Sequence, residues 1–233
     1  MNELFKKHET LFCISLIVIY VVINSYCMQN FQSTDYRSTL VNTIFSCLLI
    51  VLMIKLNRLD YYGIRKVENA KNYLYFIPLF IIGTVNLWGG INIDKPLKDI
   101  LFYILTMVNV GFIEEIIFRG FLFKMMAKDN VKSAIIVSSI TFGIGHIVNL
   151  LNGADFIPTI LQICYAISLG YLFVTIFYKS NSLIPCIIIH ILINSLAIFN
   201  VTNNVSVYIA PIVLIIIPLS YAIFINKTIK EKN

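Results

Sequence analysis

Residues 114–120 read EEIIFRG, and the residues on either side of this stretch are apolar. The stretch lies inside the long apolar segment Ile100–Phe123, so two carboxylates and a guanidinium share one hydrophobic helix. At the centre of a bilayer each charge costs roughly 2.5–3.5 kcal/mol, whereas each apolar neighbour returns only about 0.3–0.6 kcal/mol. These three side chains must therefore face a protein interior or a wet cavity, which makes them candidates for a functional site.

The composition of the whole chain indicates a membrane protein. Hydrophobic residues make up 58% of the 233 residues, charged residues make up 13%, and the mean hydropathy is +0.84. Soluble domains carry about 25% charged residues, so the composition excludes a soluble enzyme and a disordered chain. The net charge of +6 does not indicate nucleic-acid binding, because the basic residues lie between apolar runs rather than in one patch. We expect no nucleic-acid partner.

Eight segments are long and apolar enough to cross a bilayer, which takes about 20 residues with a range of roughly 17–25. They are Leu11–Met28, Leu40–Leu56, Tyr73–Ile91, Ile100–Phe123, Ala134–Leu151, Phe156–Tyr178, Leu183–Phe199 and Val205–Ile225. The connections between them are short, and no internal repeat is evident. The sequence therefore predicts an all-α polytopic membrane protein, a bundle of about eight transmembrane helices in a single domain over residues 1–233.

The distribution of basic residues predicts the orientation of this bundle. If both termini are cytoplasmic, the inside segments carry 14 Lys and Arg residues and the outside loops carry only three. This asymmetry agrees with the positive-inside rule, so we expect a multi-pass cell-membrane protein with both termini in the cytoplasm. The short loops and the Ile-, Asn- and Lys-rich composition favour a bacterial plasma membrane. Five scattered cysteines without a C-x-x-C pair indicate neither a disulfide framework nor a structural zinc site.

The spacing of the ionisable residues in the fourth segment predicts how they are paired. Glu115 and Arg119 are four residues apart, so they share a helix face and can form an ion pair. Glu114 is turned by about 100° and has no cation one turn away on its own helix. Two interpretations remain open: Glu114 accepts a proton in catalysis, or it is a spare carboxylate bonded to a neighbouring helix beside a structural ion pair.

Two further segments carry a histidine at a similar depth. His146 ends the stretch FGIGH (residues 142–146), in which two glycines allow a helix or a substrate backbone to approach closely. His190 is followed one turn later by Asn194, so both side chains project from one face. At 1.5 Å per residue, these groups and the glutamates lie roughly 14–21 Å from the nearest cytoplasmic lysine on their helices. One shared site near the middle of the bilayer explains this coincidence.

The residue types at this shared site point to hydrolysis. The sequence offers no Ser-His-Asp arrangement, no H-E-x-x-H motif and no marked serine nucleophile. What remains is an activated water, generated either by a glutamate directly or by a His/His/Glu metal site. Glutamate and histidine within spans also form proton relays in transporters, but inverted repeats and paired broken helices are absent from this sequence.

Three motifs resemble those of the CAAX-protease and bacteriocin-processing family of intramembrane proteases, known as CPBP or ABI. EEIIFRG matches the E-E-x-x-x-R motif, FGIGH matches F-x-x-x-H, and HILIN at residues 190–194 matches H-x-x-x-N. They occur in the order of the family and on three separate predicted helices. The resemblance covers the core Ile100–Phe199, while the first three helices agree only in number and character.

The resemblance implies an intramembrane endopeptidase that hydrolyses membrane-associated peptides or proteins within or beside the lipid bilayer. Carried over position by position, Glu114 activates water and His146 orients it, while His190 and Asn194 stabilise the oxyanion. Glu115, Arg119 and Phe142 support the site.

The resemblance also leaves alternatives open. A metal-free mechanism needs no cofactor, whereas a zinc-dependent version of the same protease would use Glu114, His146 and His190 as ligands. A non-catalytic role, as a bacteriocin self-immunity factor or a regulatory membrane protein, is the other alternative. The sequence indicates no particular substrate and no oligomeric state.

Overall fold

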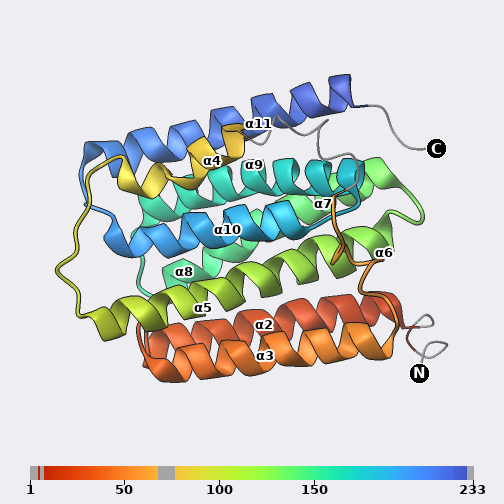
Figure 1. Ribbon diagram of the computed structural model, residues 1–233, viewed down its shortest axis with the longest axis horizontal. Helices are drawn as coiled ribbons and strands as arrows, with labels where there is room; N and C mark the ends of the chain where they lie inside the picture. The colour runs from red at the N-terminus through yellow and green to blue at the C-terminus, as the bar shows by residue number, and fades with distance from the viewer. Residues whose placement is uncertain (1–4, 6–7, 68–76, 230–233) are drawn as a thin grey trace.

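The apolar segments of the sequence form helices that run side by side in the computed structural model (Figure 1). The structure describes residues 5, 8–67 and 77–229. Six helices in these ranges are long and apolar enough to cross a membrane, so the chain is a multi-pass membrane protein. They are α2 (Glu9–Asn30), α3 (Tyr36–Lys55), Leu97–Met126, Val131–Leu151, α9 (Phe156–Ser180) and Val205–Thr228.

Three of these long helices change their winding along their length. Leu97–Met126 consists of α5 (Leu97–Glu115), the π-helical η3 (Ile116–Phe123) and α6 (Lys124–Met126). Val131–Leu151 consists of α7 (Val131–Ile144), the 3₁₀ turn η4 (Gly145–Ile147) and α8 (Val148–Leu151). Val205–Thr228 consists of the π-helical η6 (Val205–Ile209) and α11 (Ala210–Thr228). Two of the changes in winding fall within the motifs singled out in the sequence.

Among the described residues, two of the eight predicted segments contain no helix long enough to cross a membrane, so six of the eight expected spans are found. The third contains α4 (Ile77–Gly83) and the 3₁₀ turn η2 (Val85–Leu87), while its predicted residues 73–76 lie outside the described part. The seventh contains α10 (Ile184–Leu196) and the turn η5 (Ala197–Phe199).

The residues that follow the turns η2 and η5 pair with each other through their backbones. The chain leaves η2 through a turn at Trp88 and Gly89 and leaves η5 in an extended form, and Ile91 and Asn200 pair as an isolated antiparallel β-bridge. The backbone N–H of Asn92 also donates to the carbonyl of Phe199 at 2.9 Å. These backbone groups therefore bond across the two segments instead of continuing two helices.

The interior of the bundle lies around α9, the most buried of the long helices, whereas α2 is the least buried. α9 packs between α7 and α11, and α5 packs against α3 and α10 (Figure 1). The close approach of α5 and α10 depends on Gly111, where an added Cβ would lie 2.8 Å from Ile191 Cγ1. This packing brings the fourth, fifth and seventh predicted segments together.

The end of the bundle at which α2 begins is tied together by loop contacts. Glu9 forms ion pairs with Lys128 and, at 3.9 Å, with Arg58. The carbonyl of Gly63 accepts a hydrogen bond from Leu183 N at 2.8 Å. The loop after α3 is therefore docked on the turn between α9 and α10, which holds these helices in register with α2.

Candidate active site

The two glutamates of the EEIIFRG stretch lie where α5 passes into η3. Adjacent residues on a helix point about 100° apart, and the two carboxylates accordingly have different surroundings. The side chain of Glu114 is 12% exposed and lines a cavity, whereas that of Glu115 is completely buried. π-helical turns occur frequently at functional sites, and η3 begins directly after this pair.

Glu115 and Arg119 form the ion pair that their spacing predicts. Arg119 Nη1 donates to Glu115 Oε1 at 3.1 Å, and both side chains are fully buried. Arg119 Nε and Nη2 and Glu115 Oε2 have no hydrogen-bond partner among the described residues. The pair is therefore held by one hydrogen bond and its mutual charge, which makes each partner costly to remove without the other.

The ring of Phe142 is the packing centre of the site. The guanidinium of Arg119 lies over this ring, 4.2 Å from its centroid, in cation–π geometry. The rings of His146 and His190 contact it edge to face, at centroid distances of 5.3 and 5.7 Å. Phe142 thus fixes one cation and two imidazoles at once, which gives a physical role to the first residue of the FGIGH stretch.

His190 lies between the two glutamates. Its Nδ1 is 2.8 Å from Glu115 Oε1, and its Nε2 is 3.4 Å from Glu114 Oε2. Because an ionised carboxylate can only accept, the bond to Glu115 places a proton on Nδ1. The imidazole is therefore oriented by the buried carboxylate and presents Nε2 towards the cavity and Glu114.

His146 is oriented by the backbone of its own helix. It lies in the 3₁₀ turn η4, and its Nδ1 is 3.1 Å from the carbonyl oxygen of Phe142. A carbonyl oxygen can only accept a hydrogen bond, so Nδ1 carries the proton and the neutral ring keeps Nε2 as an acceptor. In this tautomer His146 accepts a hydrogen bond at Nε2, so it is able to orient a water molecule.

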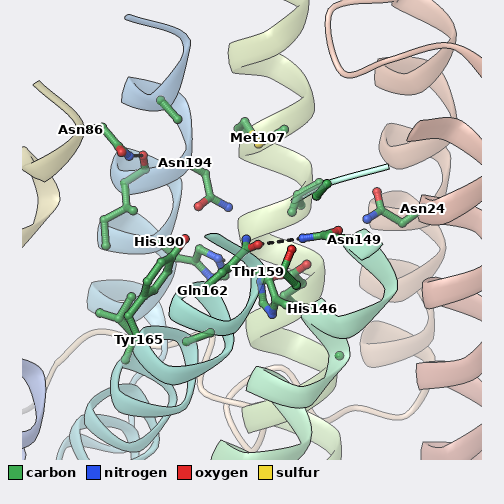
Figure 2. A pocket seen from close by; sticks show the side chains of 18 of the residues that line it. Asn24, Asn86, Met107, His146, Asn149, Thr159, Gln162, Tyr165, His190 and Asn194 are labelled. Atoms are coloured by element: carbon green, nitrogen blue, oxygen red, sulfur yellow. Dashed lines mark hydrogen bonds and ion pairs between the residues drawn. The ribbon is translucent and has the colours of Figure 1, made fainter. Parts of the chain in front are cut away.

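The predicted site residues converge on one cavity of about 510 Å³. Glu114, Phe142, His146, His190 and Asn194 all line it, while Glu115 and Arg119 lie behind them in the protein interior. Figure 2 shows His190 and Asn194 on α10, with His146 contributed from the other side by η4. The structure thus brings together three motifs that are spread over about 80 residues of sequence.

Tyr20 is a member of the site that the sequence analysis missed. Its hydroxyl, on α2, donates to Glu114 Oε1 at 2.9 Å, and the residue is only 3% exposed. Glu114 is therefore not free of partners: one oxygen is held by Tyr20 and the other faces His190. Tyr20 lies in an apolar segment and carries no charge, so nothing in the sequence pattern marks it as a site residue.

The residues named for a zinc site do not gather into a metal centre. Among the described residues, no group of three His, Cys, Asp or Glu side chains is placed to hold a metal ion. Nδ1 of both histidines is already bonded, in His190 to Glu115 and in His146 to the backbone. These bonds leave Nε2 of both histidines available, so zinc dependence stays an alternative, and the mechanism proposed for this site uses the side chains alone.

The comparisons with known proteins agree with the family suggested by the motifs. Residues 96–196 match the family model described as "Type II CAAX prenyl endopeptidase Rce1-like". The match spans α5 to α10 and so includes all three motifs. No curated protein and no solved structure matches the chain.

Proposed function

We propose that the chain is a member of the family of type II CAAX prenyl endopeptidases whose model matches residues 96–196. We propose further that it cleaves membrane-associated peptides or proteins inside the bilayer by means of a glutamate-activated water. The match to this family model agrees with the resemblance drawn from the three motifs and supports a peptidase. The roles of individual residues, the substrate and the orientation in the membrane are our proposals.

Glu114 is the proposed general base. Its carboxylate lines the cavity and is held at Oε1 by Tyr20, so it presents a fixed acceptor to a water molecule. The water oxygen attacks the carbonyl carbon of the substrate while its proton passes to Glu114. General-base catalysis of this kind contributes typically 10²–10⁴-fold to the rate. His146, with Nε2 as an acceptor, orients the same water molecule.

His190 and Asn194 are the proposed oxyanion stabilisers. The attack places a negative charge on the former carbonyl oxygen, and donors aimed at that position lower the barrier. The amide of Asn194 supplies one donor, and a doubly protonated His190 supplies a second from Nε2. When the tetrahedral intermediate collapses, the C–N bond breaks and the proton on Glu114 passes to the leaving amine. The products are a carboxylic acid and an amine, which balances the addition of one water molecule.

The observation that carries this proposal is the convergence of Glu114, His146, His190 and Asn194 on one cavity from three helices. A structural ion pair explains the burial of Glu115 and Arg119 but not the placement of the other four side chains. Helix-to-helix hydrogen bonds alone would not leave His146 Nε2 and the Asn194 amide directed into a cavity.

The test is cleavage by the purified protein in proteoliposomes, with a library of fluorescence-quenched apolar peptides. We expect cleavage, with the same rate before and after treatment with a chelator, and its loss in Glu114→Gln. The exposed Asp60→Asn is the matched control, since it removes a carboxylate outside the cavity. Absence of cleavage by a folded wild-type protein would favour the non-catalytic alternative, and a loss on chelation restored by zinc would favour the metal-dependent one.

We also propose the setting in which this reaction occurs. The asymmetry of basic residues favours a bundle with both termini in the cytoplasm, and the composition favours a bacterial plasma membrane. Glu114 and His190 then lie well inside the bilayer, so the substrate must reach the cavity from the lipid phase or from a water-filled opening.

A further inference from the structure

A second cavity, of about 270 Å³, lies at the end of the bundle where α2 begins. In Figure 1 this is the right-hand end of the molecule, where α6 lies. The walls come from the loop after α3, from the end of the helix Leu97–Met126 with the loop that follows it, and from the end of α9. The cavity shares no lining residue with the one beside Glu114, so it is a separate feature of the molecule.

Two lysines, Lys124 and Lys128, line this second cavity. Lys128 forms an ion pair with Glu9, and the same carboxylate lies 3.9 Å from Arg58 Nη1. Glu9 is therefore shared between two cations. Among the described residues, no carboxylate forms an ion pair with Lys124. The cavity wall thus carries an excess of positive charge.

Lys124 is held in place by aromatic rings instead of a carboxylate. Its Nζ lies 4.8 Å from the ring centroid of Phe177 and 5.2 Å from that of Tyr61. Cation–π contacts of this kind position an ammonium group but leave its charge uncompensated. Lys124 is also half-buried, so it has less contact with water than a lysine on an open surface. A fixed cation without a counter-ion favours the binding of an anion.

The other walls of the cavity indicate what kind of anion fits. They include the apolar side chains of Phe123, Ala127 and Val131. A small inorganic anion is polar on every side and gains nothing from such walls, whereas a phospholipid joins a charged phosphate to an apolar body. The helix Leu97–Met126 ends two residues after Lys124, which is the depth at which lipid headgroups lie. Lysine binds phosphate as a point charge, and basic pockets between transmembrane helices bind anionic headgroups.

We propose that this cavity binds an anionic phospholipid, with its phosphate at Lys124 and Lys128 and its glycerol and upper acyl chain along Phe123 and Val131. The proposal depends neither on the proposed catalytic function nor on which side of the membrane this end faces. Glu114 lies ten residues from Lys124 on the same continuous helix. A headgroup held at Lys124 therefore also fixes the depth of Glu114 in the bilayer.

The first test compares two lipids on the wild-type protein. The purified full-length protein, in an uncharged detergent, is titrated with short-chain phosphatidylglycerol or phosphatidylcholine, and the bound lipid is measured by native mass spectrometry. Both lipids carry a phosphate, but only phosphatidylglycerol has a net negative charge. We expect phosphatidylglycerol to bind at least about tenfold more tightly, from two lysines near the headgroup. Equal binding of the two lipids would overturn the proposal, and this comparison needs no variant.

The second test removes one charge inside the cavity or one outside it. Lys124→Gln alters the cavity wall, and Lys55→Gln is the matched control, because Lys55 is exposed at the same end of the bundle and does not line the cavity. We expect Lys124→Gln to weaken phosphatidylglycerol binding at least about fivefold, Lys124→Arg to keep it, and Lys55→Gln to change it less than about twofold. Equal losses in Lys124→Gln and Lys55→Gln would show that the preference arises from overall charge, against the proposal.

The third test separates a lipid headgroup from free phosphate. The thermal unfolding of the wild-type protein in detergent is measured with phosphatidylglycerol, with inorganic phosphate, and with chloride at the same ionic strength. We expect the unfolding temperature to rise with phosphatidylglycerol, and inorganic phosphate to have no more effect than chloride. An equal rise with inorganic phosphate would identify the cavity as a site for the free anion and overturn the lipid assignment.

Discussion

Glu114 and Glu115 are neighbours in the chain that share a contact with His190 but differ in their other partner. Glu114 lines the cavity and contacts Tyr20 and His190, whereas Glu115 is enclosed with Arg119. We therefore expect different results from their isosteric amides. Glu114→Gln removes the proton acceptor, so cleavage should fall by about 10²–10⁴-fold in a folded protein. Glu115→Gln leaves Arg119 as a buried uncompensated charge, which costs about 3–5 kcal/mol of stability.

The measurements are peptide cleavage and thermal unfolding of both variants in one detergent. The control is the double variant Glu115→Gln/Arg119→Gln, in which no charge is left unpaired, and we expect it to recover part of the lost stability. Wild-type cleavage by a well-folded Glu114→Gln protein would reject the general-base role. A Glu115→Gln protein as stable as wild type would reject the structural role of the ion pair.

Tyr20 acts on the site through Glu114 and is a positioning residue. Its hydroxyl bonds to one carboxylate oxygen, and a hydrogen bond to a charged group contributes about 1.5–3 kcal/mol. Tyr20→Phe keeps the ring and removes this bond, so we expect kcat to fall about tenfold while KM stays unchanged. The comparison is with Tyr103→Phe, which alters another tyrosine of the cavity wall. An equal fall in kcat for both variants would contradict a specific role of Tyr20.

At the scale of helices, the two glycines of the FGIGH stretch have separate functions. Gly143 lies at the contact of α7 with α9, where an added Cβ would be 2.3 Å from Ile167 Cγ1 and 2.9 Å from the carbonyl oxygen of Ile163. Gly145 has no neighbouring atom within 4 Å of such a Cβ and lines the cavity. Close approach of a helix therefore depends on Gly143, while Gly145 leaves space in the cavity.

The matched pair Gly143→Ala and Gly145→Ala tests this division. Overpacking at Gly143 should destabilise the protein by about 1–3 kcal/mol, since α7 and α9 cannot keep their distance. Gly145→Ala should change stability by about 0.5 kcal/mol or less but raise KM, because its methyl group projects into the cavity. Thermal unfolding and cleavage kinetics measure the two effects. Equal destabilisation by both substitutions would contradict the assignment.

Much of the element pattern could be predicted because apolar length is a strong signal. The runs that became α2, α3, α9 and the helix Leu97–Met126 are each predominantly apolar over a membrane thickness. The shortness of α10 could not be predicted in this way. Beyond α10 and η5, Asn200 pairs with Ile91, more than 100 positions away, and apolar composition carries no information on such a long-range contact.

The site could be predicted only in part, because some of its residues carry a signal in the sequence and others do not. Charges and histidines inside apolar runs are rare, so Glu114, Glu115 and His190 are visible from the sequence, and four-residue spacing indicates the ion pair of Glu115 and Arg119. Tyr20 is uncharged and lies on another helix, so only tertiary packing reveals that it faces the same cavity. The π-helical winding of η3 has no residue signature in this stretch.

For the whole molecule, the distribution of charge and the course of the chain indicate one orientation. α2 begins and α11 ends at the same end of the bundle (Figure 1). Most described basic residues outside the site lie at this end, namely Lys55, Arg58, Arg65, Lys66, Lys124, Lys128, Lys132, Lys179 and Lys227. The opposite end carries Arg37, Lys95 and Lys98. We therefore propose, by the positive-inside rule, that the end at which α2 begins and α11 ends faces the cytoplasm.

This orientation predicts a labelling pattern for two exposed aspartates at opposite ends, Asp60 in the loop after α3 and Asp94 before α5. Each is replaced by cysteine in a cysteine-free background, because the native Cys47 and Cys164 are exposed. Aspartate is chosen because its loss leaves the count of basic residues, and hence the orientation signal, unchanged.

In intact cells a membrane-impermeant maleimide should label Asp94→Cys, and it should reach Asp60→Cys only after the membrane is permeabilised. Labelling of both from outside would contradict the placement of these two loops on opposite sides of the membrane. Labelling of Asp60→Cys alone would reverse the orientation and place the basic end outside.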